Sequence, residues 1–179
     1  NKVGNYNVNI GSYAGQYATG SNNSFVGYQA GRGGQTSAPY SSGQYNTAMG
    51  YQALDAFTTG IYNTAVGHQA GGAISSGDYN TALGNYALSN VTTGYENVGI
   101  GSGTNGPTTG YSNTVVGYRA GESMGASHSS VLIGNLAGLN FSAGGNNTVA
   151  IGRWAGGYAT GSYNTFVGGN AGKGGTTTN

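Results

Sequence analysis

Polar and apolar residues alternate in a short segment that recurs ten times along this chain. In the clearest copy, residues 63–67 read Asn-Thr-Ala-Val-Gly, so alternating side chains end at a glycine. Because successive side chains of a strand point to opposite faces, the residue before this glycine shares a face with the residue two positions earlier. The pattern predicts β-strands, with two stretches of about four or five residues and turns between them in each unit, and no 3.6-residue period indicates a helix.

The glycine that ends each segment marks a regular repeat, Gly-x-x-Asn-(Thr/Val/Ser)-x-aliphatic-Gly-x-x-Ala. Its ten copies are at Gly11, Gly27, Gly50, Gly67, Gly84, Gly101, Gly117, Gly134, Gly152 and Gly168. A short fixed period is typical of a solenoid, in which each repeat buries its apolar side chains against its neighbours. We therefore expect residues 1–179 to form a single all-β domain, a parallel β-solenoid (β-roll) of about ten coils of about 17 residues.

An aliphatic residue precedes the marker glycine in all ten copies. These residues are Ile10, Val26, Met49, Val66, Leu83, Ile100, Val116, Ile133, Ile151 and Val167. We expect this row to point into the core, together with the Thr, Val or Ser two positions earlier. Nine of the ten copies place Ala three residues after the glycine, which suits a site where two walls of a narrow coil approach each other.

The residue between the two expected inward positions is more apolar than a solvated face requires. Phe25, Val115, Leu132 and Phe166 are its largest members. Two interpretations remain open: these residues form an interface between subunits, or the strand bends and they belong to a wider core.

An asparagine precedes most strands and indicates a corner of the coil. Its copies are Asn7, Asn23, Asn46, Asn63, Asn80, Asn97, Asn113 and Asn164. Asn tolerates a left-handed conformation and binds neighbouring backbone, so we expect these side chains to stack as a ladder. A glycine lies three residues before most of them, and we expect it to need a positive φ.

Composition narrows the classes of function. The chain has 38 glycines among 179 residues, five basic and four acidic residues, a net charge of +1 and no cysteine. So little charge gives no field that attracts nucleic acid or anionic lipid. No apolar run reaches the ~18 residues of a membrane span, so we expect no direct membrane insertion. The chain begins at Asn1 without a signal-like segment, so we expect an excerpt or a processed form.

Candidate chemistry is sparse. Asp55, Asp78, Glu96 and Glu122 fall in different repeats, and His68 and His128 lack nearby ligand or catalytic motifs. Calcium-binding β-rolls place Asp in every turn, where this chain has Asn and Thr. We therefore expect no catalytic residues, no metal and no cofactor, and we do not expect an enzyme.

Two features are candidates for recognition. Tyrosines beside the expected corner, such as Tyr45, Tyr62 and Tyr79, predict outward aromatic rows suited to sugars or to neighbouring rods. The longest interval between repeats predicts a surface loop from about Arg32 to Ser42 that includes Gln35, Pro39 and Tyr40. The alternatives are that the tyrosines only stabilise the rod by stacking, and that the loop is a tolerated spacer.

Residues 63–67 and 113–117 resemble the head repeats of YadA-like trimeric autotransporter adhesins. Segments such as Thr93-Gly94-Tyr95 and Thr109-Gly110-Tyr111 are similar to repeats of phage tail-fibre-like proteins. The resemblance implies a left-handed β-roll that assembles as a homotrimer or fibre, at a cell surface or on a virion.

We expect a non-catalytic, extracellular structural or adhesive fibre segment. It would associate with itself as a homo-oligomer or filament and present a polar, Tyr-rich surface to a glycan, a host surface or another filament. An ice-binding solenoid is the alternative, but the Thr row shares the face expected to point inward. A polysaccharide-processing tail-fibre domain is less favoured, because such sites need clustered carboxylates.

Overall fold

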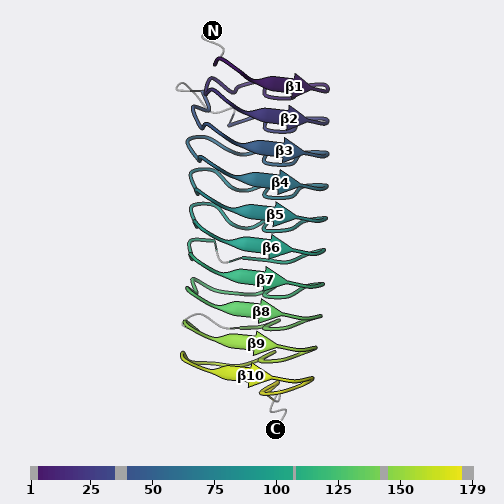
Figure 1. The fold of residues 1–179 in the computed structure, drawn as a ribbon, viewed down its shortest axis with the longest axis vertical. Coiled ribbons are helices and arrows are strands. Elements are labelled where there is room, and N and C mark those ends of the chain that lie inside the picture. Colours follow the sequence, from purple (N-terminus) through teal and green to yellow (C-terminus); the bar gives the residue numbers. More distant parts are fainter. Residues whose placement is uncertain (1–3, 35–39, 107, 142–144, 175–179) are drawn as a thin grey trace.

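The computed structural model describes residues 4–34, 40–106, 108–141 and 145–174, which form a β-solenoid as predicted. Its strands are β1 (Val8–Ile10), β2 (Ser24–Val26), β3 (Thr47–Met49), β4 (Thr64–Val66), β5 (Thr81–Leu83), β6 (Val98–Ile100), β7 (Thr114–Val116), β8 (Val131–Ile133), β9 (Val149–Ile151) and β10 (Thr165–Val167). They make one parallel sheet in the order β1 to β10, and each coil adds one strand to the rod (Figure 1). The described ranges contain no helix.

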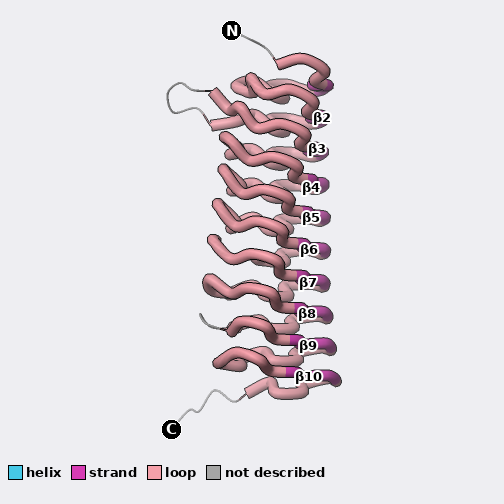
Figure 2. Tube along the Cα trace, turned by 60° about the vertical axis from the view of Figure 1, so that its left-hand side comes forward, coloured by secondary structure: helices cyan, strands magenta, loops and turns pink. Residues whose placement is uncertain are grey.

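Equivalent positions of the repeat stack directly upon one another. In β4 and β5, Thr64 pairs with Thr81, Ala65 with Ala82 and Val66 with Leu83. Hydrogen bonds between coils continue outside the strands, as from the Gly71 amide to the Ala87 carbonyl (2.8 Å). The loops therefore stack as regularly as the strands (Figure 2).

The strands turn the opposite face to the core from the one that we predicted. Phe25, Val115 and Leu132, the middle residues of their strands, are fully buried. Phe166 packs against the same core and is partly buried. The interpretation of these four residues as a subunit interface is therefore wrong.

The prediction that the aliphatic row points inward is also wrong, and the correction covers Ile10, Val26, Met49, Val66, Leu83, Ile100, Val116, Ile133, Ile151 and Val167. Seven members are exposed, from 36% at Ile133 to 67% at Val167, and the three valines Val26, Val66 and Val116 are half-buried. Alternation separates two faces without saying which is inside. The interior accepts side chains from Ala65 to Phe25 at the middle position, so the size of the residue there does not show which face is inside.

The wall opposite the strands supplies the rest of the core. The predicted row of small residues is buried, as at Ala53, Ala70 and Ala87. Phe57 and Ile74, which the sequence analysis did not single out, are buried beside it. Interdigitating side chains of this kind fill a protein interior at close-packed density.

The predicted asparagine ladder is present at the corner before the strands. The Asn63 Nδ2 donates to the Gly77 carbonyl (2.8 Å), and the Asn63 Oδ1 accepts the backbone N–H of Asn80 (2.9 Å). Asn23, Asn46, Asn63, Asn80, Asn97 and Asn113 are buried, whereas Asn7 and Asn164 at the ends are half-buried. In the two repeats without this Asn, the hydroxyl of Ser130 and the side chain of Thr148 occupy the position.

The prediction for the corner glycines is wrong for most of them. Gly60 and Gly77 do not have a positive φ, and the left-handed residue is the one before the Asn, as at Tyr62 (φ 56°). A Cβ on Gly77 would collide with the carbonyl of Gly94 in the next coil. The glycine is therefore required by the close approach of successive coils.

Candidate functional surfaces

The outer face of the strands is a regular surface that follows the whole sheet, and we call it the strand face. It consists of the first and third residue of each strand, such as Thr64 and Val66 in β4. The ten strands contain no charged residue. On this face Met49 is 50% exposed and Leu83 is 46% exposed. An exposed row of large aliphatic side chains is unusual for a free surface in water.

Stacked aromatic rings follow the corner before the strands. The ring centroids of Tyr45 and Tyr62 are 4.8 Å apart with planes at 4°, and those of Tyr62 and Tyr79 are 5.1 Å apart at 9°. The tyrosine stacking that the sequence analysis left open as one of two interpretations is therefore present. Because Tyr62 is stacked on both faces, it presents its edge and hydroxyl to a ligand, whereas Tyr45 and Tyr79 lie at the ends of this stack.

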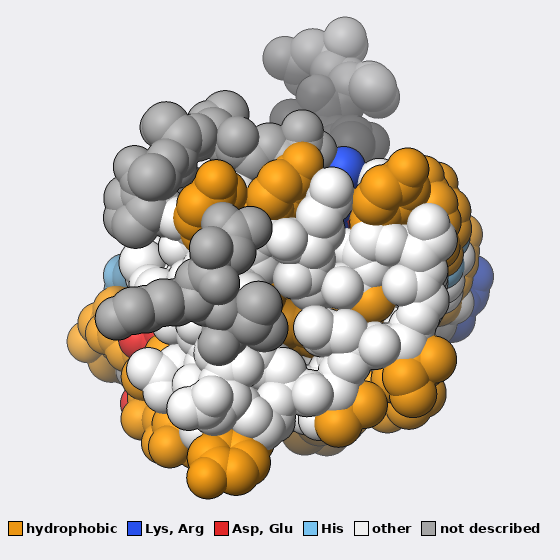
Figure 3. Space-filling view, turned by 90° about the horizontal axis from the view of Figure 1, so that it is seen from above, with side chains coloured by type: hydrophobic (Ala, Val, Ile, Leu, Met, Phe, Trp, Pro, Cys, Tyr) orange, Lys and Arg blue, Asp and Glu red, His pale blue; other side chains and the backbone are white. Residues whose placement is uncertain are grey.

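A second row of rings follows the marker glycine. Tyr28 stacks on Tyr51, and Tyr51 stacks on His68, each pair with centroids 5.2 Å apart. His68 then meets Tyr86 edge-on at 76°, so the parallel stack ends there. Viewed along the rod, hydrophobic side chains lie on several sides of the coil as well as in its interior (Figure 3).

The long interval between β2 and β3 holds the remaining candidates for recognition. Arg32 forms an ion pair with Asp55 (2.9 Å). Burial raises the pKa of the Asp55 carboxyl above its ordinary value of 3.8, and the charge of Arg32 opposes that shift only in part. Tyr40 stacks on Tyr17 at 6.3 Å, and Gln35 and Pro39 lie outside the described residues.

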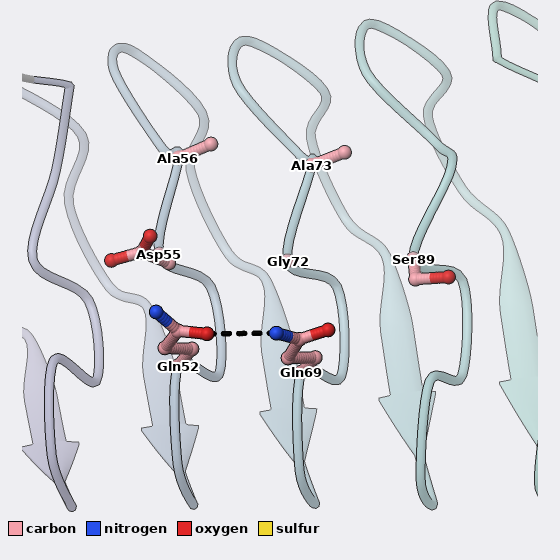
Figure 4. Close-up of a pocket in the computed structure, with 7 residues that line it drawn as sticks. All are labelled: Gln52, Asp55, Ala56, Gln69, Gly72, Ala73 and Ser89. Carbon is pink, nitrogen blue, oxygen red and sulfur yellow. Dashed lines mark hydrogen bonds between the residues drawn. The ribbon is translucent and has the colours of Figure 1, made fainter.

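Two adjacent hollows open on the wall that follows the strands. The first, of about 320 Å³, is lined by Gln52, Asp55, Gln69, Gly72 and Ser89 with two alanines (Figure 4). The second, of about 330 Å³, has the lining residues Asn85, Tyr86, Ser89, Ser102, Gly103, Asn105, Tyr118, Arg119 and Glu122. Ser89 lines both, and we call these two neighbouring hollows together the groove.

A glycine in a stacked row of side chains opens each hollow. Gly72 lies in the coil between those of Asp55 and Ser89 at the equivalent position, and Gly103 lies likewise between Tyr86 and Arg119. The groove is not visible in the repeat pattern, because a glycine in place of a larger residue is noticed only when the copies are compared position by position. Such a comparison of the fifth residue after each marker glycine would have found Gly72.

The described His, Asp and Glu residues form no compact cluster. Among the described residues, no three His, Cys, Asp or Glu side chains come together in a way that could hold a metal ion. The described part of the chain also lacks any helix long and apolar enough to cross a membrane. Neither a protein-family model, nor a curated protein, nor a solved structure matches this sequence. Function is therefore inferred from the surfaces themselves.

Proposed function

We propose that this chain is a non-catalytic, rod-forming segment of an extracellular fibre that associates with other copies of itself through the strand face. The remaining walls, which carry the tyrosine rows and the polar groove, stay exposed and supply adhesive contacts. The observation that carries the proposal is the exposed, uncharged aliphatic row that runs the length of the sheet.

The chemistry of the strand face favours burial against a second apolar surface. Ile100, Ile133 and Ile151 on successive parts of the rod are each more than a third exposed. Removing apolar area from water contributes roughly 25 cal/mol per Å². The absence of charge from the strands means that two such faces meet without burying an unpaired ion, which would cost several kcal/mol.

The size of the face sets the scale of the interface. Ten strands at a spacing of about 4.8 Å span about 43 Å, and the three residues of each strand add a width of about 10 Å. The resulting area of about 430 Å² is about half of the roughly 800 Å² per partner that stable complexes bury, so the turns that flank the strands would add to the contact. An identical copy is the partner that offers an equally long apolar face with the same spacing.

A second candidate, ice binding, gains support from one observation. Thr47 and Thr64 point outward and are exposed on consecutive coils, so the sequence argument that placed the Thr row inside no longer holds. Only half of the strands begin with Thr, and the neighbouring aliphatic residues differ in size. We therefore favour self-association, and a thermal-hysteresis measurement on the purified chain tests the alternative directly.

The decisive experiment is the mass of the purified chain in solution, by light scattering at tens of micromolar with negative-stain imaging of the same sample. We expect a multiple of the 17.8 kDa chain, as a discrete oligomer of short rods or as filaments. The double variant Leu83→Lys and Ile133→Lys should dissociate it, because two buried charges would then repel each other. A wild-type chain that is monomeric and folded would overturn the proposal.

The matched control places the same charge on another wall. Asn90→Lys and Ser123→Lys change two exposed polar positions away from the strands and should leave the mass unchanged. Circular dichroism of each variant checks the fold, since Leu83 and Ile133 are exposed and their replacement leaves the core intact. Dissociation by both pairs of lysines would indicate general charge repulsion and would also count against the strand face.

A further inference from the structure

We propose that the two hollows joined at Ser89 form a binding groove for a neutral oligosaccharide whose sugar units lie along the rod. This inference concerns a wall other than the strand face and does not depend on self-association. It rests on the free ring face of a tyrosine, unused hydrogen-bonding groups, balanced charge and the spacing of the coils.

The ring of Tyr86 differs from the stacked tyrosines at the corner. Its contact with His68 is edge-on, and the next coil has Gly103 at the position equivalent to Tyr86. Tyr86 is 42% exposed, and no parallel ring covers it among the described residues. A free aromatic face beside polar groups is the surface on which the apolar face of a pyranose ring packs.

Hydrogen-bonding groups on the groove are left unused by the fold. The Gln29, Gln52 and Gln69 side chains form a ladder, with Nε2 to Oε1 distances of 2.8 and 2.7 Å. The ladder ends at Gln69, because the next coil has Tyr86 at that position. The Gln69 Oε1 and the Ser89 Oγ therefore have no hydrogen-bond partner within the described ranges and suit sugar hydroxyls.

The charges around the groove cancel. Asp55 in the first hollow is paired with Arg32, and Glu122 in the second is paired with Arg119. A charged ligand would have to compete with these pairs, whereas a neutral polyhydroxylated chain would not. Balanced charge therefore favours a neutral saccharide over a uronic-acid or sialylated chain.

The length of the groove fits a chain of several sugars. It runs from the coil of Gln52 to the coil of Glu122, four coil spacings or about 19 Å. One coil spacing of about 4.8 Å is about the length of one pyranose unit in an extended chain. About four units can therefore meet equivalent positions of successive coils.

The test titrates the wild-type chain with three hexasaccharide probes, the neutral cellohexaose and maltohexaose and the anionic hyaluronan hexasaccharide. Binding is followed by NMR of backbone and side-chain amides. We expect one of the neutral probes to bind with a Kd below about 1 mM and to shift the NMR signals of Gln69 and its neighbours. Free glucose should bind more weakly than that hexasaccharide. If neither neutral probe binds below about 10 mM, or if only the anionic probe does, the inference is wrong.

Two substitutions and two controls locate the site. Tyr86→Ala removes the free ring, and Gly72→Gln fills the first hollow, where an added Cβ would lie 3.2 Å from the nearest backbone oxygen. Each should weaken binding by about tenfold or more. Tyr62→Ala, whose ring is stacked on both faces, and Gln29→Ala, at the far end of the glutamine ladder, should not.

Equal loss of binding in Tyr62→Ala and Tyr86→Ala would overturn the assignment to the groove. The same titration on the strand-face variant Leu83→Lys and Ile133→Lys separates this inference from self-association. Sugar binding should persist in that variant whether or not the wild-type chain forms oligomers. Loss of binding in it would mean that the saccharide site is made by the assembly and not by the groove of one rod.

Discussion

The asparagine ladder provides the sharpest test of what holds the coils together. In Asn63→Ala, the Gly77 carbonyl loses its donor at 2.8 Å, and the backbone N–H of Asn80 loses its acceptor at 2.9 Å. Both residues are buried, so water does not replace the missing groups. Leaving a buried backbone group unsatisfied costs about 1–3 kcal/mol. The two together predict that the free energy of unfolding falls by about 2–6 kcal/mol.

The chain contains a matched control at its last coil. The Asn164 Nδ2 donates only to the Gly161 carbonyl, in an exposed hydrogen bond, so Asn164→Ala should cost less than about 1 kcal/mol. The loss of stability in Asn63→Ser should fall between the two, because the Ser130 hydroxyl already donates to the Gly145 carbonyl and accepts the Thr148 amide of the next coil.

Urea unfolding followed by circular dichroism measures the overall loss of stability, and hydrogen exchange of the Asn80 amide measures the local one. A loss of 2 kcal/mol or more corresponds to exchange about 30-fold faster or more. Equal stability of Asn63→Ala and Asn164→Ala, within about 0.5 kcal/mol, would refute the argument that this ladder carries unsatisfiable backbone groups.

Two further predictions concern a glycine and a carboxyl group. Gly67→Ala should destabilise the rod by several kcal/mol, because φ is +134° and the added Cβ would lie 2.5 Å from a carbonyl oxygen of the next coil. Gly168 has a similar φ but open space around it, so Gly168→Ala isolates the backbone strain. Gly169 has neither a positive φ nor a close neighbour, so Gly169→Ala should be nearly neutral in thermal unfolding. Burial raises the pKa of Asp55 above 3.8, so the folded chain binds this proton more tightly than the unfolded chain does, and stability falls as pH rises above 3.8. The unfolding free energy of the wild type relative to Asp55→Asn should therefore decrease as the pH rises from 3.8 through the raised pKa of Asp55. An increase would show that the attraction of Arg32 outweighs burial.

The repeat determined the architecture because every strand was visible as the same alternating segment before a glycine. The ten strands end at the aliphatic residue before each marker glycine, as at Val66 and Leu83. The Asn ladder was also predictable, since its hydrogen bonds follow from one residue type at one corner. Local patterns of this kind need no knowledge of the interior.

The orientation of the strands was not predictable from alternation, because the two faces of a strand are equivalent until the opposite wall is known. Phe57 and Ile74, on that wall, help to decide which side is buried. They belong to an apolar row seven residues after the marker glycine, with Val91, Met124 and Phe141, and the strand pattern does not include this row. The groove was hidden for a related reason. Gly72 and Gly103 act through space left empty between neighbouring coils, and a single sequence pattern records residues that are present.

The direction of the hydrogen bonds between coils has a mechanical consequence. They run from one coil to the next, along the long axis of the rod, so a pull on the two ends loads them in an unzipping geometry. Peeling off one coil would release about 17 residues, or about 58 Å of extended chain, in exchange for about 5 Å of rod. In a force-extension measurement, the rod should lengthen in steps of about 50 Å. It would dissipate mechanical energy as coils unfold one by one, and its maximum extension would be set by its number of coils.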